Sequence, residues 1–170
     1  YLDLASKLVS LGFRSAPLEG DPLCRFRKDD LTLDVMPIDG QVLGFTNRWF
    51  NYAFSTAVTI SLSADVTIRV ATPLALVATK MEAFLDRGGG DVVASHDLED
   101  LFTLLAGDDD LVDQIAKGDL EVHRFLRINL GRICRDPLSG SALRGHFLPD
   151  PASQRRGDEV IRRLRELPED

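Results

Sequence analysis

The segment spanning residues 72–105 constrains the fold most, because it predicts two amphipathic helices joined by a glycine-rich loop. Thr72 and Pro73 are typical of a helix start, since the hydroxyl caps the first turn and proline lacks only an N–H that this turn leaves unused. The glycines at 88–90 are expected to end the first helix, and Ser95 is expected to cap the second. Apolar residues recur at helical spacing in both helices: Leu74, Val77, Ala78, Met81 and Leu85, then Leu98, Leu101, Phe102 and Leu105.

Four charged residues border these apolar faces. Lys80 lies near the edge of the first apolar stripe, and Arg87 directly precedes the glycines. Asp97 and Asp100 are three residues apart near the start of the second helix, so they share one side of it. The helix dipole favours acids there by roughly 0.3–1 kcal/mol each, which alone would account for the pair. Their combination with Lys80 and Arg87 predicts a compact polar cluster beside an apolar core.

Composition limits the classes of protein that fit. The chain has 170 residues, 44% of them hydrophobic and 28% charged, which is enough for one domain with a substantial core. Its net charge of −7 argues against a protein that coats nucleic acid through phosphate contacts. No apolar run approaches the roughly 18 residues that span a bilayer, and no segment resembles a signal peptide. Cys24 and Cys134 are expected to be buried thiols. These features predict a cytoplasmic protein without a membrane partner.

Alternating residues predict two antiparallel hairpins, one formed by residues 23–27 and 31–36 and one by residues 58–62 and 66–70. Asp34 interrupts the apolar run of its strand, where aspartate is disfavoured. It is either a solvated acid at a sheet edge or a carboxylate positioned for a metal, and its oxygens suit Mg²⁺. The remaining pattern is helical over residues 1–11, 110–117, 119–134 and 153–167, with a break at 137–145.

Six short phrases fall in one order along the chain: LGF at 11–13, CRF at 24–26, LDVMP at 33–37, LGFTNRW at 43–49, TKMEAF at 79–84 and SHDLED at 95–100. In order and spacing they resemble the nucleotidyltransferases of the abortive-infection AbiEii type, which belong to the DNA polymerase β-like superfamily. The resemblance covers nearly the whole chain and is looser after Gly107.

The resemblance implies an α/β (α+β) fold with a small mixed sheet and antiparallel hairpins over residues 1–106, followed by a helical extension over residues 107–170. It also implies an enzyme that transfers a nucleotide from a nucleoside triphosphate (NTP) to an RNA or protein acceptor. Such enzymes act in toxin–antitoxin or abortive-infection systems, so an antitoxin protein is a further expected partner.

The resemblance also assigns roles to single residues. Three carboxylates in this family hold Mg²⁺ and the triphosphate, and Asp34 matches the third of them. Lys80 matches the helix lysine that contacts the phosphates, and Asp97, followed by Asp100, matches a later acid of the site. Arg25 and Arg87 are expected to help hold the phosphates.

One departure from the family pattern concerns the other two carboxylates. The family places them in an Asp-x-Asp strand after a Gly-Gly or Gly-Ser turn, and no such segment precedes the first helix of this sequence. Asp3 lies within that helix and cannot replace them, and the first residue is Tyr1 rather than methionine. We therefore expect a fragment of a longer enzyme. Two alternatives stay open: a degenerate, non-catalytic domain that binds a nucleotide or a protein partner, and a structural helical module in which Asp34, Lys80 and Asp97 do not converge.

Overall fold

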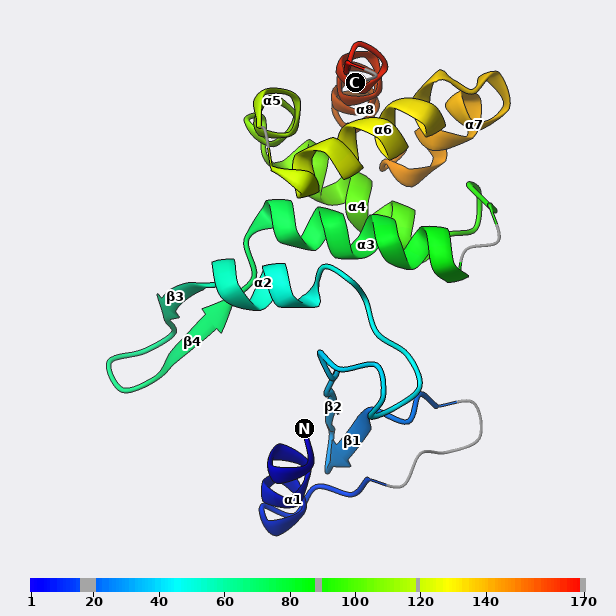
Figure 1. Ribbon diagram of the computed structural model, residues 1–170. Helices are drawn as coiled ribbons and strands as arrows, with labels where there is room; N and C mark the ends of the chain where they lie inside the picture. Colours follow the sequence, from blue (N-terminus) through cyan, green and yellow to red (C-terminus); the bar gives the residue numbers. More distant parts are fainter. Residues whose placement is uncertain (16–20, 88–89, 119, 169–170) are drawn as a thin grey trace. The chain divides into compact units, whose positions relative to one another are not determined.

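The computed structural model describes residues 1–15, 21–87, 90–118 and 120–168, which fall into two compact units, Tyr1–Asn47 and Arg48–Asp170. Each unit contains helix and one two-stranded antiparallel sheet, so the chain has the predicted α+β class (Figure 1). The predicted boundary at residue 106 lies within the second unit, at the end of helix α4 (His96–Gly107).

In the first unit, α1 (Leu2–Ser10) precedes a hairpin of β1 (Arg25–Lys28) and β2 (Leu31–Asp34). The turn consists of Asp29 and Asp30, and Asp29 has a φ of 50°, a left-handed conformation that aspartate tolerates. This turn sets a register in which Arg25 lies opposite Asp34. The first predicted hairpin is therefore confirmed. The buried apolar side chains of this unit include Leu8, Cys24 and Phe26.

The second unit begins with α2 (Phe50–Thr56) and a hairpin of β3 (Val58–Ser61) and β4 (Thr67–Val70), which confirms the second predicted hairpin. Side chains on a strand alternate between its two faces, so one face of this hairpin is apolar and the other carries threonine, serine and Arg69. Most of the apolar face is exposed: Val58, Ile60, Leu62, Val66 and Ile68.

Helices form the rest of the second unit (Figure 1). After α3 (Pro73–Arg87) and α4 come α5 (Leu111–Lys117), α6 (Glu121–Arg135), α7 (Pro137–Ala142), a 3-10 turn η1 (Leu143–His146) and α8 (Pro151–Arg165). Helix α3 packs against α4 and α6, and α6 packs against α8. Both predicted caps are present, because Thr72 Oγ1 accepts from Ala75 N at 3.4 Å and Ser95 Oγ accepts from Leu98 N at 3.3 Å. In the described ranges, no helix is both long and apolar enough to span a bilayer.

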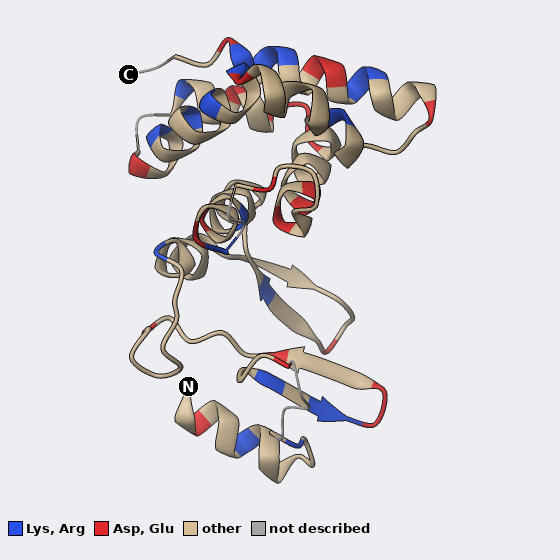
Figure 2. Cartoon of the chain, turned by 90° about the vertical axis from the view of Figure 1, so that its right-hand side faces the viewer, with Lys and Arg blue, Asp and Glu red and all other residues tan. Residues whose placement is uncertain are grey.

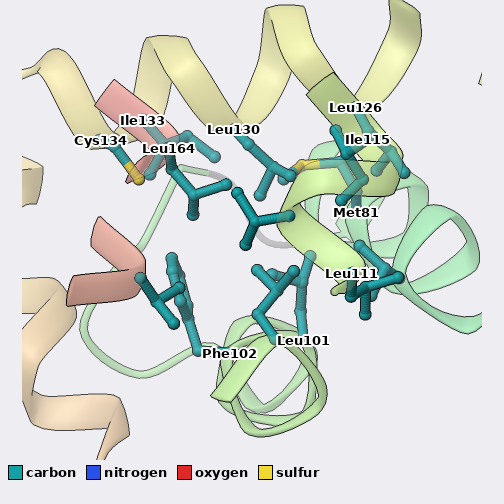
Figure 3. Close-up of a cluster of buried hydrophobic side chains, with 14 of the residues drawn as sticks. Met81, Leu101, Phe102, Leu111, Ile115, Leu126, Leu130, Ile133, Cys134 and Leu164 are labelled. Carbon is teal, nitrogen blue, oxygen red and sulfur yellow. The ribbon is translucent and has the colours of Figure 1, made fainter. Parts of the chain in front are cut away.

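The core of the second unit lies where α3, α4, α5, α6 and α8 meet (Figure 3). Its fully buried side chains include Met81, Leu101, Phe102, Leu111, Leu126, Leu130 and Leu164. Nearly all predicted core positions of α3 and α4 are buried. This core holds the two helices that carry the predicted polar cluster in a fixed relation.

Two details differ from the sequence prediction. Leu85 is 39% exposed, and Phe84 occupies the inward position instead, since a residue three places after Met81 lies on the same helical face. The predicted break at 137–145 is wrong, because residues 137–142 form α7. Asp136 caps this short helix by accepting from Ser139 N at 2.8 Å, and Pro137 takes the first position.

Gly157 allows α8 to approach the ring of Phe147. A methyl group at Gly157 would lie 2.5 Å from Phe147 Cδ2, and that ring packs against Phe102 at a centroid distance of 5.7 Å. Alanine gains about 1 kcal/mol over glycine in an open helix, whereas overpacking of a core costs about 1–3 kcal/mol. We therefore expect Gly157→Ala to lower the free energy of unfolding in urea.

Gly107→Ala is the matched control, because a methyl group at Gly107 meets no described atom within 4 Å. We expect it to leave the free energy of unfolding unchanged or slightly higher. Equal changes in the free energy of unfolding for the two substitutions would show that the Phe147 ring moves away from the added methyl group at no cost in stability.

The two cysteines report on the two units separately. Cys24 in the first unit and Cys134 in the second are both free and buried. Burial raises the pKa of the Cys134 thiol to about 12, and burial together with the charge of Asp34 raises the pKa of Cys24. Thiolates are the reactive form, so both groups should react slowly with a disulfide reagent in the native protein.

Single-cysteine variants test this expectation. We expect the thiol of Cys24 (in Cys134→Ala) to react faster than that of Cys134 (in Cys24→Ser), because fewer apolar side chains are buried among the described residues of the first unit than among those of the second. Full reaction of both is expected in denaturant. Native reaction of Cys134 at the rate of a small thiol would contradict the burial described here.

Candidate functional site

Four of the predicted site residues meet on the surface of α3 and α4, and we call them the α3–α4 charge cluster: Lys80, Arg87, Asp97 and Asp100. Lys80 and Arg87 are seven residues apart on α3, close to two turns, so they point to the same side. Asp97 and Asp100 lie in the first part of α4, which packs directly on α3. The sequence prediction of a compact polar cluster is confirmed.

Asp97 joins the two cations of this cluster. Lys80 Nζ lies 3.4 Å from Asp97 Oδ1, and Arg87 donates from its terminal nitrogen to Asp97 Oδ2 at 3.0 Å. Lys80 Nζ also donates to Asp100 Oδ2 at 2.5 Å. A single carboxylate thus contacts both Lys80 and Arg87, which indicates that one small anionic group is able to do so.

The four side chains differ in exposure. Asp97 is 18% exposed and Lys80 34%, whereas Asp100 is 57% exposed and Arg87 67%. Partial burial alone would lower the pKa of Lys80, but the hydrogen bond to Asp100 and the charges of Asp100 and Asp97 outweigh it and raise that pKa. Lys80 therefore stays protonated at neutral pH, and it is suited to bind an anion rather than to accept a proton.

Asp34 and Arg25 pair with each other in the first unit. Arg25 Nε and one terminal nitrogen donate to the two oxygens of Asp34, both at 2.7 Å. These hydrogen bonds lower the pKa of Asp34. Figure 2 shows the basic residues of β1 followed by the acidic turn of this hairpin. Both oxygens of the predicted metal ligand are thus held by an arginine.

These residues do not fit a Mg²⁺ site as they stand. Magnesium binds to carboxylates that are free to donate oxygen ligands, whereas Asp34 faces a guanidinium group. In the part of the chain that the structure describes, no group of three or more His, Cys, Asp or Glu side chains is placed to hold a metal ion. The role of Asp34 as a metal ligand stays a prediction, and it requires that Arg25 release the carboxylate.

Sequence reasoning missed the role of Asp21. Asp21 accepts from Arg25 at 3.1 Å and from Arg27 at 2.9 Å, and it is largely buried. Two arginines on one face of β1 were a signal that an acid lies nearby.

The expected glycine loop lies mostly outside the described residues, since only Gly90 of the three glycines is described.

Two cavities of about 450 Å³ each occur in the second unit, and Glu99, the neighbour of Asp100 in the chain, lines one of them. One is lined by residues of α4, of the segment after η1 and of α8, including Phe147, Leu148 and Arg156. None of the four cluster residues lines either cavity.

Comparison of the chain with protein-family models, with curated proteins and with solved structures finds no match. The resemblance to AbiEii-type nucleotidyltransferases therefore stays a prediction.

Proposed function

We propose that this chain belongs to a nucleotidyltransferase that transfers a nucleotide from an NTP to an RNA or protein acceptor, and that the α3–α4 charge cluster binds the phosphates. The observation that supports this most is the placement of Lys80 and Arg87 around one carboxylate, at an accessible surface. By its resemblance the enzyme acts in a toxin–antitoxin system, with an antitoxin protein as a further partner.

The chemistry of the transfer assigns a task to each cluster residue. An acceptor oxygen attacks the α-phosphorus, the bond from that phosphorus to its bridging oxygen breaks, and pyrophosphate leaves with the electron pair while the acceptor proton passes to solvent. Lys80 offsets the negative charge that grows on the leaving pyrophosphate. Arg87 offers a planar fork that matches phosphate oxygens. Asp97, bound by both cations, orients them.

The metal that the resemblance implies would offset further charge on the phosphates. Since the described residues do not fit a metal site, we assign no step to it.

Isothermal titration of the four NTPs into this chain, in the presence of Mg²⁺, tests the proposal. We expect all four to bind with similar affinity, because the cluster contacts phosphates and not bases. Inorganic tripolyphosphate should compete with each of them. A nucleotide that binds without competition from tripolyphosphate, or the absence of any binding, would contradict the proposal.

A second candidate function is that of a non-catalytic domain that binds a nucleotide or a protein partner. Two observations favour it: the pairing of Asp34 with Arg25, and the exposed apolar face of the β3–β4 hairpin. Exposed apolar patches of this kind often mark protein-binding surfaces. Transfer of a labelled nucleotide to RNA or to protein, assayed with a form of the protein that carries all three carboxylates implied by the resemblance, separates the two candidates, because only the first predicts a labelled product.

A further inference from the structure

We propose that Asp100 is a displaceable counter-anion of Lys80, and that it restricts the α3–α4 charge cluster to ligands with several phosphate charges. This inference rests on the proposed phosphate-binding role of the cluster. It adds a specificity-determining residue and names the ligand class as polyphosphates, in preference to inorganic phosphate or a monophosphate.

The geometry of the two acids supports different roles. Asp97 is held at both oxygens, one by Lys80 and one by Arg87, and it is mostly buried. Asp100 contacts Lys80 through one oxygen at 2.5 Å, and more than half of its side chain is exposed. Asp100 is therefore the acid that can turn to solvent while Asp97 keeps the two cations oriented.

The charges of the cluster explain the selectivity. With Asp100 in place, two cations face two carboxylates, so the four side chains carry no net charge. When Asp100 turns away to solvent, Lys80, Arg87 and Asp97 together carry a net charge of +1, which a bound anion can neutralise. A singly bound anion must compete with a carboxylate that is already attached to the same protein and therefore has a high effective concentration. A polyphosphate overcomes this competition because it contacts Lys80 and Arg87 together and carries several negative charges.

Asp100→Asn tests the inference, and Glu99→Gln is its matched control. Both substitutions remove one negative charge from the first turns of α4, and the two acids are almost equally exposed, at 57% and 58%. Glu99 pairs with His96 and does not contact Lys80 among the described residues. The probes are inorganic phosphate, pyrophosphate and tripolyphosphate, titrated calorimetrically into each variant.

We expect Asp100→Asn to bind tripolyphosphate about 3-fold more tightly than the unaltered chain and inorganic phosphate about 10-fold more tightly, since inorganic phosphate depends on the position beside Lys80 that Asp100 occupies, whereas tripolyphosphate is also held by Arg87. The ratio of the affinity for tripolyphosphate to the affinity for inorganic phosphate should therefore be lower in Asp100→Asn than in the unaltered chain. Glu99→Gln should change each affinity less than about 2-fold. Asp100→Ala should behave like Asp100→Asn. Because alanine cannot form a hydrogen bond through its side chain, agreement between the two variants excludes an effect of a new hydrogen bond from asparagine.

Unchanged or weaker binding of all three phosphates in both Asp100 variants would overturn the inference. Even with that result, the proposed function would stand without the inference about Asp100 if tripolyphosphate bound to the unaltered chain and did not bind to Lys80→Ala. Absence of phosphate binding in every variant would overturn both.

Discussion

Lys80→Ala is expected to weaken the binding of NTPs and of tripolyphosphate about 10- to 100-fold. A hydrogen bond to a charged group contributes about 1.5–3 kcal/mol, and each 1.4 kcal/mol corresponds to about tenfold in affinity. Asp100 and Asp97 already raise the pKa of Lys80 against the effect of partial burial, so the positive charge is present throughout the neutral range. Calorimetric titration of the purified variant measures the loss.

Lys117→Ala is the control for this substitution. Lys117 is 77% exposed and pairs with Asp113 at 3.0 Å, so its replacement also removes one positive charge from a helix surface, whereas Lys80→Ala removes the pairs with both Asp97 and Asp100. We expect less than a 2-fold change in phosphate affinity, and neither variant should lose more than about 1 kcal/mol of stability. An equal loss of affinity in both would indicate a response to net charge. Unchanged affinity in Lys80→Ala would leave the cluster only the structural role of joining α3 to α4.

Leu101→Ala is expected to lower the free energy of unfolding by about 2–5 kcal/mol, the usual range for a leucine removed from a packed core. Leu101 is fully buried on α4, within the cluster of side chains that joins α3, α5 and α6 (Figure 3). Because small domains are stable by only about 5–15 kcal/mol, this loss is a large share of the total. Urea denaturation followed by circular dichroism measures it.

Leu85→Ala makes the same chemical change at an exposed position of α3. Surface substitutions usually change stability by less than about 0.5 kcal/mol, so the two variants should differ by at least about 1.5 kcal/mol. A similar loss at both positions would contradict the burial described for the core.

The helix pair and the charge cluster could be predicted because they depend on local signals. Thr72 and Ser95 cap their helices as their positions indicated. Helical spacing then placed Lys80 and the pair Asp97 and Asp100 on the edges of two apolar faces that had to pack together. Short-range rules of this kind determine which side chains share a face.

The pairing of Asp34 with Arg25 could have been predicted from the sequence but was not. A turn of Asp29 and Asp30 places residue 28 opposite residue 31, and the same register places residue 25 opposite residue 34. Opposite charges directly across an antiparallel pair attract each other. Considered alone, Asp34 was compatible with a metal-binding role, whereas the register of the hairpin identifies Arg25 as its partner.

Other features depend on long-range packing and could not be read from the sequence. Whether an amphipathic hairpin is covered depends on what lies against it, so the exposed apolar face of β3–β4 had no local signal. The division of the chain after Asn47 likewise depends on contacts between distant segments. By contrast, α7 follows the same cap-and-proline rule as α3, and its Asp136-Pro137 start was overlooked.

The most direct test of the central claim, that the α3–α4 charge cluster binds phosphates, is a nuclear magnetic resonance titration of the ¹⁵N-labelled chain with tripolyphosphate. We predict that the largest shifts fall on the amides of residues 80–87 and 97–100, and that they vanish in Lys80→Ala. Shifts centred instead on Phe147, Leu148 and Arg156, beside the cavity of about 450 Å³, would contradict the account, as would no shifts at all.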